Sequence, residues 1–208
     1  MPYLLYISAS PQGARSVSRS LANEFLAHYA INNPGVDIVE RDLITNPVPH
    51  LDGETLGASW SPAETHTPSM SAKFKARMEL INEFKGAQEI LVSTPMWNWS
   101  VPSVLKAYID HLVYPGVLGS GKPEESISAK VTVVASQGGS YAPGTPKEGW
   151  DHLSGYLSKV FTQLGSKDVE VILSELNYAG MVPGMETLLE KKQASFARAQ
   201  EKTKRRTA

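Results

Sequence analysis

The sequence predicts a single α/β domain built on a doubly wound, five-stranded parallel sheet with helices on both faces. Two observations lead to this fold class. Five short apolar runs recur along the chain, and segments whose apolar residues follow helical spacing lie between them. Strands that alternate with helices are typical of parallel sheets. No internal repeat or linker divides the chain, so one domain is expected over residues 1–208.

Each apolar run is short enough for a strand and ends in polar residues or glycine. The first run is continuously apolar, which is typical of a strand buried on both faces of a sheet. The second run alternates and is expected to be more exposed. We expect strands over residues 3–7, 36–43, 89–94, 130–135 and 169–173.

Apolar residues at helical spacing predict a helix after each strand. Gly86 and Gly165 mark two helix ends, and Pro102 suits the first turn of a helix. Residues 44–70 and 114–128 show no period and are expected to be long, irregular segments that carry function or form an interface. We expect helices around residues 21–29, 73–84, 102–112 and 153–164, and from about residue 185 to the basic end of the chain.

The composition argues against several classes of function. With 20 Lys and Arg against 21 Asp and Glu, the formal net charge is -1, which argues against nucleic acid as the main partner. The absence of cysteine excludes disulfides and thiolate chemistry. The five histidines show no metal-ligand spacing, so no metal is expected. No apolar run approaches the ~20 residues of a membrane-spanning helix and no leader is seen, so we expect a cytoplasmic protein without membrane contact.

Ligands of doubly wound sheets bind at the carboxyl ends of the strands, near the point where strand order reverses. The loops after the first, third and fourth strands are therefore expected to converge. The loop after the third strand, residues 93–102, displays Trp97, Asn98 and Trp99 between two prolines. We interpret it as a clamp for a planar flavin ring; the alternative is a strand-to-helix loop with two surface tryptophans.

The loop after the first strand places hydroxyl groups and backbone amides directly ahead of a helix. That combination favours a phosphate group, although Ser16 or Ser18 as a simple helix cap is the alternative. After the fourth strand, Gly138 and Gly139 leave room for a flat ring edge, or else form an ordinary turn.

Two apparent motifs carry little weight. Residues 116–123 match most of a nucleotide phosphate loop, but they end in proline and follow a helix. Residues 103–106 match a serine–lysine pattern without its partner motifs, and no Gly-x-Ser-x-Gly elbow occurs.

The three loops, in their order and spacing, resemble those of the FMN-dependent NADH azoreductases, which are also NAD(P)H quinone reductases with a flavodoxin-like fold. The resemblance also covers residues 51–54 and 156–157, and so most of the chain. It implies a homodimer with non-covalent FMN at each interface site. It further implies that NADH or NADPH reduces the flavin and leaves before the quinone or azo acceptor binds, in a ping-pong sequence. No side chain is then expected to be catalytic, because the flavin carries the hydride.

By the same resemblance, three groups of residues hold the cofactor. The phosphate group is expected at Ser10, Ser16, Val17 and Ser18; the isoalloxazine ring at Met96, Trp97, Asn98 and Trp99, with Ser136, Gln137, Gly138 and Gly139 on its other side. The acceptor pocket is expected to include Trp60, Trp97, Trp99 and Tyr141.

The chain departs from the family pattern where tryptophans replace the usual tyrosine and phenylalanine, and where Gln137 replaces a frequent arginine. The segment 114–128 is also short and lacks the usual aromatic residues. These departures affect acceptor preference more than cofactor identity. We expect the loop that carries Trp60 to cover the neighbouring subunit's flavin. The alternative functions are a flavodoxin-type electron carrier and a flavin-binding module without turnover.

Overall fold

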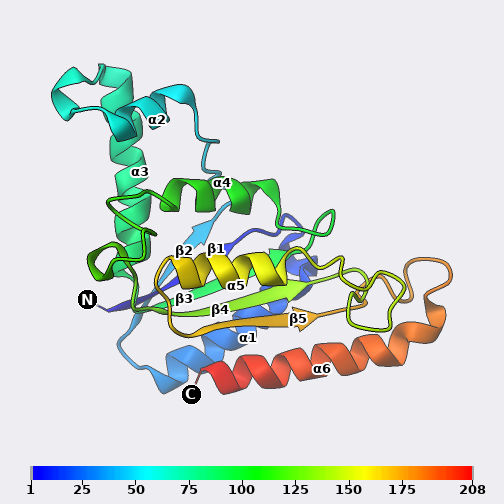
Figure 1. The fold of residues 1–208 in the computed structure, drawn as a ribbon. Helices are drawn as coiled ribbons and strands as arrows, with labels where there is room; N and C mark the ends of the chain where they lie inside the picture. Colours follow the sequence, from blue (N-terminus) through cyan, green and yellow to red (C-terminus); the bar gives the residue numbers. More distant parts are fainter. Residues whose placement is uncertain (1, 208) are drawn as a thin grey trace.

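In the computed structural model, which describes residues 2–207, the five predicted strands form one parallel sheet in the order β2-β1-β3-β4-β5 (Figure 1). Strand β1 is almost fully buried whereas β2, at the edge, is half-exposed, as their apolar patterns predict. The strands are β1 (Tyr3–Ser8), β2 (Asp37–Asp42), β3 (Glu89–Pro95), β4 (Lys130–Ser136) and β5 (Val169–Ser174).

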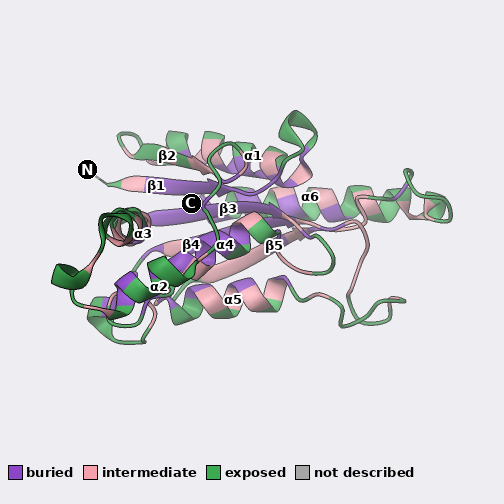
Figure 2. Ribbon diagram, turned by 90° about the horizontal axis from the view of Figure 1, so that it is seen from above, coloured by how far each residue is buried: buried purple, intermediate pink, exposed green. Residues whose placement is uncertain are grey.

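Helices cover both faces of the sheet, as predicted (Figures 1 and 2). On one face, α1 and α6 bury Leu21, Phe25 and Ala199 against the sheet. On the other face, α3, α4 and α5 bury a larger cluster that includes Phe84 and Phe161. The helices are α1 (Val17–Asn32), α3 (Pro68–Gly86), α4 (Ser103–Leu112), α5 (Ser154–Gln163) and α6 (Leu189–Arg206).

The expectation that residues 44–70 are irregular was wrong. They contain α2 (Gly53–Trp60), and α3 already begins at Pro68. Asp52 begins α2 by accepting a hydrogen bond of 2.8 Å from the Thr55 amide. The helix has two glycines and only eight residues, so it shows too little apolar spacing to be recognised from the pattern.

Helix α2 and the adjoining end of α3 stand off the sheet (Figure 1). Arg77 holds them to the body of the domain, since its buried guanidinium donates to the carbonyls of His111 and Val113 and to the Ser59 hydroxyl. Both carbonyls lie at the C-terminal end of α4, where the helix dipole favours a cation. The remaining short elements are the 3-10 turns Gly13–Arg15, Ala63–Thr65, Pro123–Glu125 and Glu186–Leu188.

We predict that Gly165→Ala destabilises the domain by about 2 kcal/mol or more, because Gly165 ends α5 at a φ of 111°. A Cβ atom there would also lie 2.4 Å from the Cβ of Ser126. The matched change Gly155→Ala, inside α5 with open space around it, should instead be neutral or stabilising by up to ~1 kcal/mol. Urea unfolding of both variants measures the difference, and equal midpoints would contradict the prediction.

Candidate functional site

The loops after β1, β3 and β4 meet at the carboxyl edge of the sheet, as expected. Strand order reverses between β1 and β3, because β2 and β3 flank β1 on opposite sides. The edge is joined by backbone hydrogen bonds from Ala9 to Ser93 (2.9 Å) and from Met96 to Ser136 (2.8 Å). The structure therefore brings the serine loop, the tryptophan loop and the glycine pair together in space.

The tryptophan loop makes a tight turn in an uncommon backbone conformation. Asn98 and Trp99 have φ angles of 47° and 66°, in the left-handed region that side chains other than glycine seldom adopt. Reciprocal backbone hydrogen bonds of 3.0 Å between Trp97 and Ser100 close the turn. Within residues 2–207, the amides of Asn98 and Trp99 donate to no other residue, so two N–H groups at the edge of the sheet are available to a ligand.

A second loop, residues 140–152, is fixed against this turn. The His152 amide donates to the Trp99 carbonyl at 3.0 Å. The Trp150 ring meets the Trp99 ring edge-on, with centroids 5.0 Å apart, and Lys147 Nζ lies 5.5 Å from the Trp99 ring centre. The loop that follows the glycine pair thus supports the strained turn.

The serine loop has the capping role that was considered for it, and it also leaves donors free for an anion. Ser16 is the N-cap of α1, since its hydroxyl accepts from the Arg19 amide at 3.2 Å. Ser16 and Ser18 also share a hydrogen bond of 3.2 Å, and both are almost fully buried. The amides of Val17 and Ser18, in the first turn of α1, have no backbone acceptor among residues 2–207. These amides are suited to bind an anion at the positive end of the helix.

Arg19 is close to this loop, but its guanidinium group is paired with residues of β1 and β2. Its Nη2 donates to Asp42 at 2.7 Å and to Ser8 at 2.6 Å, and Glu40 lies 3.6 Å from Nη1. Partial burial opposes ionisation of Asp42, but the hydrogen bonds from Arg19 and from the amides of Ile44 and Thr45 lower its pKa. A phosphate group in the serine loop would therefore be held by amides and hydroxyls.

Packing requires a glycine at one of the two positions of the glycine pair, Gly138. A Cβ atom on Gly138 would lie 2.4 Å from Cε2 of Tyr178, whose ring occupies that space. The Tyr178 amide donates to the Gly138 carbonyl at 3.0 Å, so the loop after β5 is attached to the glycine segment. A Cβ atom on Gly139 would meet nothing nearer than 3.7 Å, which leaves that side of the pair open.

Gln137 presents a buried polar atom without a partner. Its Nε2 donates to Asp151 at 3.0 Å, while its Oε1 has no hydrogen bond among the described residues although the side chain is 1% exposed. Burial opposes ionisation of Asp151, but hydrogen bonds from Ser154, Gln137 and the Leu153 amide lower its pKa. Asp151 therefore remains an acceptor that fixes the Gln137 amide, and the orphaned Oε1 is an acceptor for a ligand donor.

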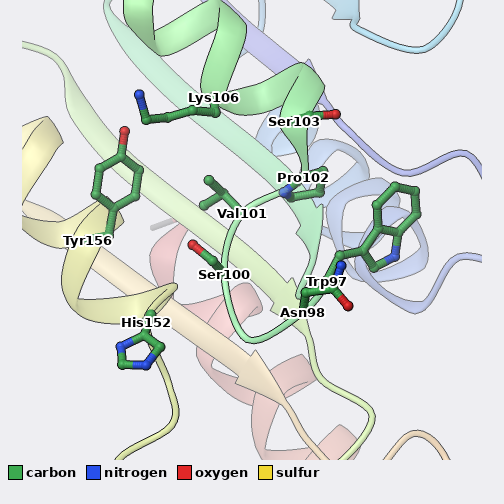
Figure 3. Close-up of a pocket in the computed structure, with 9 residues that line it drawn as sticks. All are labelled: Trp97, Asn98, Ser100, Val101, Pro102, Ser103, Lys106, His152 and Tyr156. Carbon is green, nitrogen blue, oxygen red and sulfur yellow. The ribbon is translucent and has the colours of Figure 1, made fainter.

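A hollow of about 540 Å³ lies beside the tryptophan turn (Figure 3). Lys106 from α4 and Tyr156 from α5 reach toward each other on one side of the loop, and Trp97 lies on the other (Figure 3). Burial, with a smaller contribution from Asp110, raises the pKa of Tyr156 to about 12, so its hydroxyl remains a neutral donor. The sequence analysis did not assign Lys106, His152 or Tyr156 to the site. Lys106 appeared only in a serine–lysine pattern without partner motifs, Tyr156 appeared only in a helix covered by the family resemblance, and His152 belongs to no motif.

The predicted acceptor-pocket residues are only partly brought together. Trp97 and Trp99 belong to the turn, and Tyr141 accepts at its carbonyl from the Gly149 amide within the neighbouring loop. Trp60 lies elsewhere: it is 68% exposed and meets Tyr114, beyond the C-terminal end of α4, edge-on at 6.1 Å. The turn precedes the other end of α4, which has 10 residues and so a length of about 15 Å.

The residues at this edge fit FMN. The free amides of α1 suit its phosphate group, the free amides of the Asn98–Trp99 turn suit acceptor atoms of its ring, and Gln137 Oε1 suits a ring N–H. By contrast, among residues 2–207 no group of three His, Cys, Asp or Glu side chains could hold a metal ion. No helix in the same range has the length and apolar character to cross a membrane.

Comparison with solved structures identifies the same architecture. An azoreductase from Bacillus anthracis strain Sterne superposes with a TM-score of 0.85, at 21% identity over 100% of this chain and 99% of that one. An FMN-dependent NADH-azoreductase from B. anthracis strain Ames Ancestor, solved with FMN, gives a TM-score of 0.80 at 22% identity over the whole of both chains. At these identities the likeness concerns the fold.

Sequence comparison is more specific. The model of the flavodoxin-like fold family matches residues 3–205. An FMN-dependent NADH:quinone oxidoreductase from Frankia alni is 43% identical over 187 residues, which cover 89% of each chain. This chain therefore belongs to the flavodoxin-like fold family and, within it, to the FMN-dependent NADH:quinone oxidoreductases.

Proposed function

We propose that this protein is an FMN-dependent enzyme that uses NADH or NADPH to reduce quinones and azo compounds. The observation that carries this proposal is the turn at Asn98 and Trp99, where two free amides lie at the carboxyl edge between an anion-binding helix end and a glycine pair. The names of the relatives support the same activity. For a quinone, the overall reaction converts NADH, a proton and the quinone into NAD⁺ and the hydroquinone.

Bound FMN would supply the hydride chemistry, and the chain would bind, orient and shield it. Val17 and Ser18 amides with the neighbouring hydroxyls are proposed to hold the phosphate group. The turn amides are proposed to bind acceptor atoms of the ring, with Gln137 oriented by Asp151 on the other side. A single pocket for both substrates requires that the nicotinamide nucleotide leaves before the acceptor binds.

We further propose that the active protein is a homodimer in which Trp60 covers the partner's site. Trp60 is 68% exposed and Leu56, one turn before it in α2, is 43% exposed. Both residues belong to α2, which projects from the sheet together with the adjoining end of α3 (Figure 1). An exposed tryptophan on a projecting helix, remote from the site of its own chain, supports a role at a subunit interface.

We predict that the purified protein is yellow, bleaches when NADH is added without oxygen, and recovers its colour with a quinone. Initial rates at several fixed quinone concentrations should give parallel double-reciprocal lines, because the substrates take turns at one pocket. A colourless protein that cannot be reconstituted with FMN would refute the cofactor assignment. Bleaching by NADH without recovery by any two-electron acceptor would instead favour a carrier or a binding module.

We predict that the double change Ser16→Ala and Ser18→Ala weakens FMN at least tenfold more than riboflavin, because each lost hydrogen bond to a phosphate contributes about 1.5–3 kcal/mol. Riboflavin lacks the phosphate group, so it controls for the loss of the α1 cap. Ser20→Ala, on the exposed side of the same helix, is the matched variant. Titrations monitored by flavin fluorescence measure both ligands, and equal weakening would move the phosphate elsewhere.

The proposed role of Trp60 predicts complementation between two defective subunits. Trp60→Ala and the double serine variant should each have low activity as homodimers. In a mixed dimer, one site combines an intact serine loop from one chain with an intact Trp60 from the other. Mixing equal amounts of the variants and allowing random subunit exchange should therefore restore about a quarter of the wild-type sites, since half of the dimers are mixed and each mixed dimer has one intact site. No gain over the sum of the separate variants would show that Trp60 does not serve the partner's site.

A further inference from the structure

The loop 140–152 carries a feature that the cofactor site does not use. Lys147 Nζ lies 5.5 Å from the centre of the Trp99 ring and 5.9 Å from that of the Trp150 ring. Both distances fall within the range of a cation–π contact. One ammonium group is thus held over two indoles, one of which belongs to the tryptophan turn.

Lys147 makes no ion pair within residues 2–207, and the acidic groups nearest in sequence are engaged elsewhere. Glu148 accepts from the Gly144 amide at 2.8 Å. Asp151 accepts from the Leu153 and Ser154 amides, both at 2.9 Å. The other lysine near the site, Lys106, is paired with Asp110. Lys147 is therefore an uncompensated positive charge at the edge of the site.

The loop holds this lysine in place through its own backbone. Within it, the Thr145 amide donates to Ala142, the Glu148 amide to Thr145 and the Trp150 amide to Lys147, at 3.1–3.2 Å. The rings beside the lysine are open to a ligand, because Trp99 and Trp150 remain 37% and 46% exposed. Flat apolar surface and a cation therefore lie side by side at the tryptophan turn.

We propose that Lys147, held by Trp99 and Trp150, makes this enzyme select planar acceptors that carry an anionic substituent. The two indoles offer surface for the aromatic system, and the ammonium group pairs with a sulfonate or carboxylate on it. The inference rests on the proposed function, because it concerns the acceptor of that same site. It adds the chemical class of the acceptor and the residue that recognises it.

The test compares a neutral and an anionic quinone of similar size, 2-methyl-1,4-naphthoquinone and 1,4-naphthoquinone-2-sulfonate. Lys147→Glu should lower kcat/KM for the sulfonate by about tenfold or more, with a change of less than about twofold for the neutral quinone, because only the sulfonate interacts with the charge. Lys147→Arg should keep the preference. Raising the salt concentration should reduce the wild-type preference for the sulfonate.

Lys167→Glu is the matched control. Lys167 is exposed and lies two residues before Val169, the first residue of β5, at the end of the strands opposite to the site. It changes the net charge by the same amount without altering the site. An equal loss of sulfonate activity in Lys147→Glu and Lys167→Glu would show that only the net charge matters, and it would overturn the proposal. Equal losses of activity with the two quinones in Lys147→Glu would overturn it as well.

Binding separates this inference from the proposed function. Dissociation constants of both quinones for the oxidised, FMN-loaded protein follow from quenching of tryptophan fluorescence, without turnover. A loss of sulfonate affinity confined to Lys147→Glu supports the inference even if no quinone is reduced. The lack of any quinone reduction would refute only the assignment as an enzyme. Unchanged sulfonate affinity in Lys147→Glu overturns the inference while leaving the activity with the neutral quinone intact.

Discussion

The site depends on one strained piece of backbone, the turn at Asn98 and Trp99. Two consecutive residues with side chains adopt the left-handed conformation, and each such residue costs about 1–3 kcal/mol. Asparagine tolerates this conformation, but tryptophan has no local compensation for it. The surrounding contacts must therefore hold the turn. The Trp97–Ser100 hydrogen bonds close it, and the His152 amide and the Trp150 ring fix its outer side.

The strain has a consequence for binding. Because only Trp97 and Ser100 pair across the turn, the two central amides have no partner within it, and the left-handed conformation sets the direction in which they point. In the observed conformation both amides lie at the edge of the sheet and donate to no residue in the described part of the chain. Donors that are already oriented need no rearrangement when a ligand arrives. The left-handed conformation of Asn98 and Trp99 thus fixes the orientation of this pair of donors.

The central strands were predictable because a strand buried on both faces of a sheet contains a continuous apolar run. Each range holds a continuous apolar run, residues 90–92 and 133–135, and the observed β3 and β4 extend each predicted range by one residue. Helix α2 was not predictable, because it packs mainly against α3 and the Tyr114 region and needs few apolar residues to do so. Its only local signal was Asp52 ahead of Thr55, which is a capping pattern too common to be decisive.

The candidate site divides in the same way. The serine and tryptophan loops could be located because loops at the carboxyl edge carry residues that no packing requirement explains. The packing requirement for a glycine at position 138 could not be predicted from the neighbouring sequence, since the Tyr178 ring that fills the space lies 40 residues further along the chain. Likewise, no pattern joins Lys147 to Trp99. Their contact follows from the path of the loop 140–152, which only the folded chain reveals.

The cofactor side and the acceptor side of the proposed site can change independently of each other. The proposed cofactor contacts come mainly from backbone amides at a helix end and a turn, and these survive many side-chain substitutions. The proposed acceptor side consists of Trp99 on the turn and of Trp150 and Lys147 on the loop 140–152, whose backbone hydrogen bonds are largely internal. A substitution in that loop can alter acceptor recognition while the sheet edge and its free amides stay in place. Acceptor preference is therefore the property in which this chain can differ most from its relatives.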